Sequence, residues 1–227
     1  MSWFTQTLKS TLGRKLIMAI TGLFIITFLI GHLLGNLQLF YSDGGQAFNE
    51  YAKFMTSHPF IKVLSILTYT SIVVHVIYSI ILTRHNQQAR PVKYAHNRRS
   101  ENSLWNSRNM GILGTLLLIF IVIHMRSFWY VMHWGPIEKV DYGGGEINDI
   151  YTVVVISFSE LWYVLLYVLS MGVLAFHLAH GFKSAFQTLG LSHVKYTPLL
   201  KSIGYSFAII VPAIFAAMPL YLYLKNL

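Results

Sequence analysis

Five long apolar runs set the limits on how this chain can fold. A helix of about 20 apolar residues crosses the roughly 30 Å hydrocarbon core of a bilayer. Lipid offers a backbone no hydrogen-bond partners, so segments that cross it are helices unless they close into a barrel. We therefore predict an all-α membrane bundle, a single domain over residues 1–227, with five spans at about 16–40, 60–83, 110–132, 151–182 and 203–224.

The composition excludes several classes of site and function. The chain contains no cysteine, which excludes disulfides, thiolate metal sites and covalent haem attachment. Only 11% of its residues are charged, and no polar stretch is long enough to form a second core. The net charge of +9 is attributed to basic loops that set membrane topology, and no nucleic-acid partner is expected. The first apolar run is too long for the core of a signal peptide, so we expect it to be retained.

Loop charge gives the predicted orientation. The N-terminus and the second and fourth connections together hold twelve of the seventeen basic residues, with a single acid, Glu101. The other side holds the remaining seven acids. By the positive-inside rule, the N-terminus is expected in the cytoplasm and the C-terminus outside. The twelve basic residues are Lys9, Arg14, Lys15, Arg84, Arg90, Lys93, Arg98, Arg99, Arg108, Lys183, Lys195 and Lys201.

Four histidines lie inside the predicted spans, where an ionisable group is costly and indicates function. His32 follows Lys15 by 17 residues, which at about 1.5 Å per residue places it roughly 24–25 Å from the basic boundary. His124, 16 residues after Arg108, lies at a similar depth. His75 and His177 lie only about 9–14 Å from that boundary. The histidines thus form two layers, roughly 10–15 Å apart along the membrane normal.

Two imidazoles at one depth on separate helices can hold a haem iron between them, and neutral imidazole avoids burying a charge. We therefore predict two bis-histidine haem b groups, with His75 paired to His177 and His32 to His124. His180 shares a helix face with His177 but is shallower, so it is expected to contact a haem propionate or the surface. Histidines that only hydrogen-bond to neighbouring helices, or that relay protons in an ion or proton transporter, are the alternatives. Another di-haem membrane reductase is a further alternative.

Several residues near the histidines are candidates for haem contacts. Gly31, Ser79 and Gly181 would leave room for a flat macrocycle, although ordinary small-residue helix packing explains them equally well. Arg126 and Lys183 would pair with haem propionates, although topology or snorkelling charges are the alternative for both.

The segments around these histidines resemble a known family. They are TFLIGHLLGN around His32, VHVIYS around His75, FIVIH around His124 and FHLAHGFKSAFQTLG around His177. They resemble the single-subunit, five-helix, di-haem cytochrome b anchor of succinate:quinone oxidoreductases and fumarate reductases, over nearly the whole chain. The resemblance implies that His75 and His177 hold the haem proximal to the iron–sulfur subunit, and that His32 and His124 hold the distal haem.

The resemblance also implies partners and a location. The chain would sit in the bacterial inner membrane, bind a flavoprotein and an iron–sulfur subunit on the cytoplasmic side, and exchange electrons with menaquinone among the membrane lipids. The chain itself would hold no catalytic residue for the dicarboxylate. A quinone site is expected near the distal haem, where Glu50, Lys53 and His58 are the candidates. Some relatives have a glutamate two residues before the fourth-helix ligand; here that position is Ala175.

Overall fold

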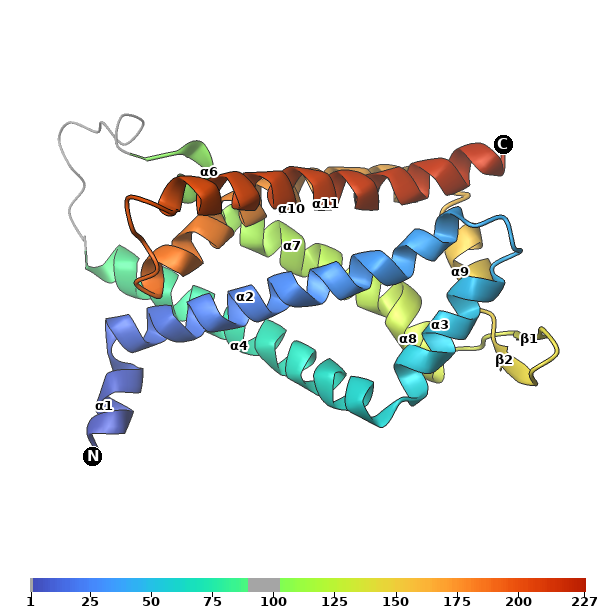
Figure 1. Cartoon of the computed structure of the whole chain (residues 1–227), viewed down its shortest axis with the longest axis horizontal. Coiled ribbons are helices and arrows are strands. Elements are labelled where there is room, and N and C mark those ends of the chain that lie inside the picture. The colour runs from blue at the N-terminus through green and yellow to red at the C-terminus, as the bar shows by residue number, and fades with distance from the viewer. Residues whose placement is uncertain (1, 90–102) are drawn as a thin grey trace. The chain divides into compact units, whose positions relative to one another are not determined.

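The computed structural model describes residues 2–89 and 103–227. Arg90, Lys93, Arg98, Arg99 and Glu101, which contributed to the predicted loop charge, lie outside this part of the chain. Figure 1 labels the elements along the chain. The long helices are α2 (Thr11–Asn36), α4 (Pro59–Gln88), α7 (Met110–His124), α10 (Leu161–Thr188) and α11 (Thr197–Lys225). Shorter elements are α1 (Trp3–Lys9), η1 (Leu37–Phe40), α3 (Gln46–Ser57), α6 (Trp105–Arg108), η2 (Met125–Trp129), α8 (Tyr130–Trp134), β1 (Lys139–Asp141), β2 (Glu146–Asn148) and α9 (Ile150–Ser157).

Within the described residues, five helical segments are long and apolar enough to cross a membrane. They are Thr11–Phe40, Pro59–Gln88, Met110–Trp134, Leu161–Thr188 and Thr197–Lys225. The prediction of a helical membrane bundle is confirmed. Most of these helices run several residues beyond the predicted spans, because a helix continues into the interfacial region where apolarity no longer marks it.

The fourth predicted span, 151–182, is wrong at its start. The structure divides it into α9 and α10, and only α10 is long enough to cross a membrane. The hydroxyls of Ser157 and Ser159 donate to the carbonyls of Val153 and Ile156, each at 2.7 Å. Such local bonds compete with helix continuation. The carbonyl of Glu160 then accepts the first N–H groups of α10.

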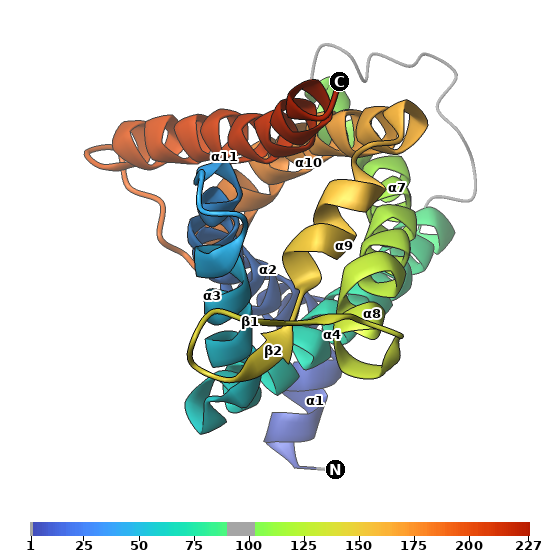
Figure 2. The same ribbon diagram turned by 90° about the vertical axis from the view of Figure 1, so that its right-hand side faces the viewer.

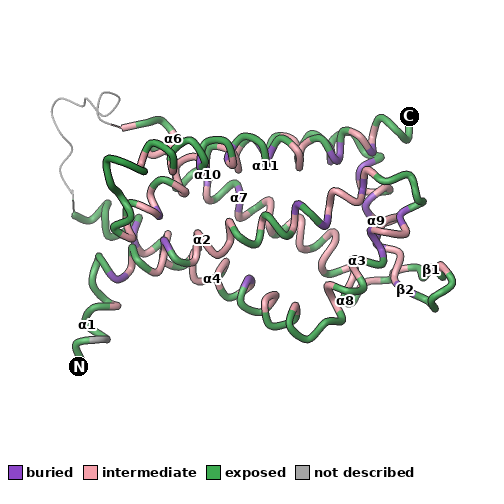
Figure 3. Tube along the Cα trace, viewed as in Figure 1, coloured by how far each residue is buried: buried purple, intermediate pink, exposed green. Residues whose placement is uncertain are grey.

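The membrane helices expose many of their apolar side chains and bury fewer. On α4, only Thr68 and Leu82 are buried, while Val73 and Ile77 are about half exposed. Buried positions form short purple stretches in Figure 3, with a cluster on α9. Large apolar surface of this kind is typical of a face that contacts lipid.

The chain divides into two compact units, each drawn from several helices. Unit 1 comprises Met1–Phe28, Leu67–Thr115 and Phe176–Ala208. Unit 2 comprises Leu29–Ile66, Leu116–Ala175 and Ile209–Leu227. His75 and His177 belong to unit 1, and His32 and His124 belong to unit 2. Each predicted histidine pair therefore lies within one unit.

Unit 2 carries a small extramembrane layer that the sequence reading did not predict. Strands β1 and β2 pair antiparallel, with Val140 opposite Ile147. In Figure 2 this hairpin lies beside α3, and α9 follows it directly. Gly45, just before α3, has a left-handed φ of 91°. A Cβ there would lie 2.7 Å from Cβ of Tyr151, so only glycine allows this approach of α3 to α9.

One buried amide joins these elements. Asn49, on α3, is completely buried. Its Nδ2 donates to Oδ1 of Asp149 at 2.9 Å and to the hydroxyl of Tyr142 at 3.1 Å. Its Oδ1 accepts the backbone N–H of Tyr151 at 2.8 Å. Asn49 therefore links α3 to the hairpin and to the first turn of α9.

Two carboxylates accept backbone N–H groups at the starts of the helices α3 and α9. Asp43 accepts the N–H groups of Ala47 at 2.8 Å and Gly45 at 3.0 Å, and these bonds lower its pKa. Burial raises the pKa of Asp149, but hydrogen bonds from Thr152 and Asn49 outweigh that effect and hold the pKa below its ordinary value. Each carboxylate thus stabilises the folded state in its ionised form.

Candidate functional site

The imidazoles of His32 and His124 face each other in unit 2. His32 comes from α2 and His124 is the last residue of α7. Their ring centroids lie 5.7 Å apart and their planes are nearly perpendicular, at 89°. Aromatic rings enclose the pair: Phe215 of α11 lies 5.6 Å from the His32 ring, and Phe120 lies 5.8 Å from the His124 ring. Two imidazoles are therefore held together among aromatic side chains.

A buried chain of hydroxyls supports His124. The Nδ1 atom of His124 lies 3.2 Å from the hydroxyl of Tyr167. That hydroxyl lies 3.2 Å from the hydroxyl of Tyr163, one turn earlier on α10. Both tyrosines are only 6% exposed. If Nδ1 is the protonated nitrogen, it donates to Tyr167 and leaves Nε2 as the free ligand atom, which is the usual arrangement of metal-binding histidines.

A π-helical turn follows His124 directly. It spans Met125–Trp129, and the chain then returns to α-helix in α8. A π-turn inserts one extra residue into a helix and is frequent at functional sites. Here it shifts the helical register between His124 and the aromatic residues that follow it. Phe128, within the turn, packs 5.5 Å from the His124 ring.

The second pair, His75 and His177, lies in unit 1. His75 comes from α4 and His177 from α10, and their ring centroids lie 6.4 Å apart. The Nδ1 atom of His75 lies 3.2 Å from Oγ1 of Thr21, on α2. A Cβ added to Gly22 would lie 3.2 Å from Cε1 of His75, so glycine there gives the ring space. The buried Nδ1 of His177 has no hydrogen-bond partner among the described residues.

The geometry of both pairs suits one metal ion between two imidazoles. A metal–imidazole bond is about 2 Å long, so the ring centres of two ligands on opposite sides of a metal lie about 6 Å apart. The observed separations are 5.7 and 6.4 Å. Among residues 2–89 and 103–227, no group of three or more His, Asp or Glu side chains converges as a metal site. The facing imidazoles of each pair are therefore the residues that could hold such a group.

The other predicted haem contacts are distributed between the two units. His180 lies on α10 one turn after His177, and Lys183 lies one turn further. The guanidinium of Arg126 lies 4.6 Å above the ring of Tyr130. The hydroxyl of Ser79 donates to the carbonyl of Val76. A Cβ on Gly31 or Gly181 would meet nothing within 4 Å. Their roles toward haem stay predictions.

The three quinone candidates do not share one site. Glu50 and Lys53, on α3, line a shallow cavity of about 250 Å³ together with Tyr142 and Ile147. Glu50 also accepts a hydrogen bond from Gln46 at 2.8 Å. His58 ends α3, packs on Phe54 at 5.2 Å and does not line this cavity. A quinone role for any of the three stays a prediction.

Sequence reasoning missed the residues that hold the ring nitrogens. Tyr167 lies ten residues before His177 but contacts His124. Thr21 lies eleven residues before His32 but contacts His75. Spacing in the sequence therefore does not indicate either contact. A polar residue within an apolar span was the available signal, because such residues usually find a partner inside the bundle. No protein-family model, curated protein or solved structure matches this chain, so the functional assignment rests on this geometry and on the sequence resemblance.

Proposed function

We propose that the chain is the di-haem cytochrome b anchor of a succinate:quinone oxidoreductase or fumarate reductase. The observation that carries the proposal is the pair of facing histidines in each unit, drawn from four different helices. His32 and His124 would hold one haem b, and His75 and His177 the other. Haem iron bound in this way accepts and releases single electrons.

The residues of this chain have three tasks in that function. The four histidines would hold the haem irons through imidazole nitrogens, and an uncharged imidazole avoids burying a ligand charge. Thr21 and Tyr167 fix the orientation of one imidazole in each pair through Nδ1. Aromatic residues pack against His32 and His124 and surround that pair with apolar rings. Two such sites at different depths would relay electrons across the bilayer.

The partners follow from the sequence resemblance. We propose that a flavoprotein and an iron–sulfur subunit dock on the cytoplasmic face, that menaquinone reacts on the membrane side, and that the complex resides in the bacterial inner membrane. The five membrane-spanning helices support a multi-pass location. Succinate or fumarate would be handled by the partner subunits.

A reduced-minus-oxidised visible spectrum with pyridine haemochrome quantification tests the proposal. We expect two non-covalent haem b groups per purified chain. A colourless protein would contradict the proposal and favour a transporter with intramembrane histidines. A single haem per chain would show that one histidine pair has another role.

Tyr167 provides a test of the support given to His124. A hydrogen bond from Nδ1 makes the imidazole a stronger donor and stabilises oxidised iron. Tyr167→Phe removes the acceptor, so we expect one haem potential to rise by about 20–60 mV, the equivalent of one hydrogen bond for one electron. Redox titration followed in the visible spectrum measures this shift.

The matched control is Tyr205→Phe, which removes a hydroxyl from an exposed tyrosine of α11 in unit 1. That variant should leave both potentials unchanged. If Tyr167→Phe also leaves both unchanged while two haems are retained, Tyr167 does not act on a haem ligand.

A further inference from the structure

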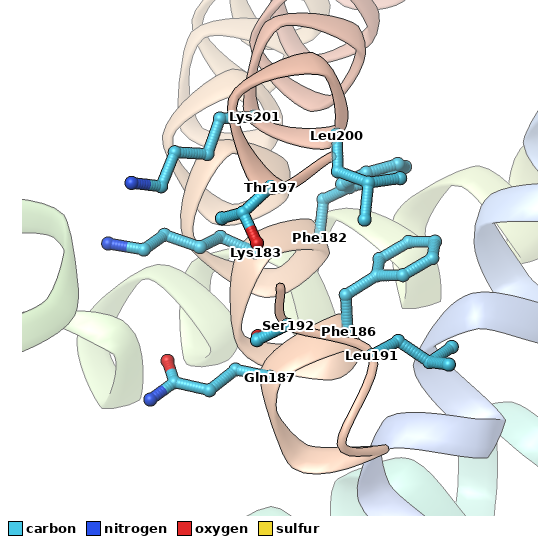
Figure 4. Close-up of a pocket in the computed structure, with 9 residues that line it drawn as sticks. All are labelled: Phe182, Lys183, Phe186, Gln187, Leu191, Ser192, Thr197, Leu200 and Lys201. Carbon is cyan, nitrogen blue, oxygen red and sulfur yellow. The ribbon is translucent and has the colours of Figure 1, made fainter. Parts of the chain in front are cut away.

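A cavity of about 260 Å³ lies in unit 1, between the end of α10 and the start of α11. Its lining differs from one side to the other. In Figure 4, Lys183, Lys201 and Gln187 extend to one side of the cavity, and Phe182, Phe186 and Leu200 lie on the other. Cationic and amide groups thus face an apolar wall across a space too small for most drug-sized ligands, whose pockets begin at about 300 Å³.

The apolar wall is built by close packing. The ring centroids of Phe182 and Phe186 lie 4.8 Å apart, with the ring planes tilted by 34°. A Cβ on Gly204 would lie 3.0 Å from Cγ of Phe182, so this glycine lets α11 approach the phenyl ring. The wall is therefore a fixed part of the contact between the two helices.

The polar side has unused hydrogen-bond donors. Neither Lys183 nor Lys201 forms an ion pair within the part of the chain that the structure describes, and both side chains are exposed. Oγ1 of Thr197 accepts the backbone N–H of His193 at 2.8 Å, which leaves its own proton to donate. Two ammonium groups, an amide and a hydroxyl together match the oxygens of one phosphate group.

The depth of the lysines points to the lipid surface. Helix α10 has 28 residues and is about 42 Å long, so about 6 Å extends beyond the hydrocarbon core at each end. Lys183 lies five residues, about 7–8 Å, before the end of α10. Lys201 lies four residues, about 6 Å, after the start of α11. Both ammonium groups can therefore reach the level of lipid headgroups.

We propose that this cavity binds the headgroup of an anionic phospholipid. Lys183 and Lys201 hold the phosphate, Gln187 and Thr197 donate further hydrogen bonds, and the start of an acyl chain lies against Phe182, Phe186 and Leu200. Basic pockets between membrane helices bind lipid phosphates in this way. An acidic soluble partner would satisfy the lysines but not the phenyl wall at membrane depth.

The test uses the full-length chain in phosphatidylcholine nanodiscs that contain a minor fraction of phosphatidylglycerol. Native mass spectrometry counts the lipids retained after partial delipidation. We expect wild type to retain phosphatidylglycerol in preference to phosphatidylcholine. Each lysine near an anionic lipid surface contributes about 1 kcal/mol to binding. The double variant Lys183→Gln/Lys201→Gln should therefore lose about 2 kcal/mol and bind phosphatidylglycerol about 30-fold more weakly.

Two further variants serve as controls. Lys195→Gln removes a lysine of the loop between α10 and α11. Lys195 does not line the cavity, so this variant should bind the lipid like wild type. Lys183→Arg/Lys201→Arg keeps both charges and should also retain the lipid. Equal retention of the two lipids by wild type, or unchanged binding in the double glutamine variant, overturns the proposal. So does displacement of the lipid by millimolar inorganic phosphate, because the site would then recognise free phosphate. The lipid count is measured separately from the haem content, so a change in haem content caused by Lys183 is distinguishable from loss of lipid.

Discussion

Replacing His177 with alanine is expected to reduce the proposed haem b content of the purified chain from two groups to one. Alanine offers no metal ligand, and the remaining imidazole of His75, whose ring now lies 6.4 Å from that of His177, cannot hold both axial positions. The haem retained should be the one between His32 and His124, because that pair belongs to the other unit. Pyridine haemochrome quantification measures the ratio, and redox titration identifies which potential is lost.

His180→Ala is the matched control, since it removes an imidazole one turn along the same face of α10. We expect this variant to retain two haems. The opposite result, with His180→Ala losing a haem and His177→Ala keeping both, would assign the axial position to His180. Loss of both haems from His177→Ala together with loss of helicity by circular dichroism would show that the histidine is required for folding of the bundle.

Replacing Asn49 with alanine is expected to destabilise the extramembrane layer by about 2–4 kcal/mol. The substitution leaves the backbone N–H of Tyr151 without its partner and removes one of the two hydrogen bonds to Oδ1 of Asp149, which keeps the bond from the N–H of Thr152. A buried polar group without a partner costs about 1–3 kcal/mol. Unfolding in detergent, followed by tryptophan fluorescence, measures the change. Gln46→Ala, which removes a half-buried amide whose hydrogen bond to Glu50 is exposed, should change stability by less than about 0.5 kcal/mol.

Acidification gives this prediction a second readout. The pKa of Asp149 is lowered in the folded state, so its ionised form stabilises the fold above the ordinary carboxyl pKa, and this stabilisation is lost as the pH falls through the lowered value. Asn49 donates one of the bonds that lower this pKa. The Asn49→Ala variant should therefore lose less stability on acidification than wild type. An equal loss in both proteins would mean that Asn49 does not act on Asp149.

The parts of the fold that depend on hydrophobic length were predictable. A segment that crosses lipid must be a long apolar helix. The helices α2, α4, α7, α10 and α11 are therefore visible in the sequence as long apolar runs. Loop charge and the constant helical rise then predicted a membrane depth for each of four histidines, His32, His75, His124 and His177. The rings that lie close together in the structure are those predicted to share a depth.

The parts that depend on single hydrogen bonds were not predictable. The break between α9 and α10 occurs where Ser157 and Ser159 bond to nearby carbonyls, while apolar residues continue on both sides. Asn49 looks like an ordinary surface amide in the sequence, and its burial depends on a hairpin about a hundred residues later. Tyr167 likewise meets His124 only through tertiary packing.

The Asn49 contact also constrains the order in which this protein can be assembled. Its partner Tyr151 lies 102 residues later in the chain. At synthesis rates of about 5–20 residues per second, Tyr151 leaves the ribosome about 5–20 s after Asn49. During that interval α3 has been made but cannot dock, so the amide must remain hydrated. Docking of α3 on the hairpin and α9 is therefore a late event in biogenesis. It can occur only after the third membrane helix and the hairpin that follows it have reached the same side of the membrane as α3.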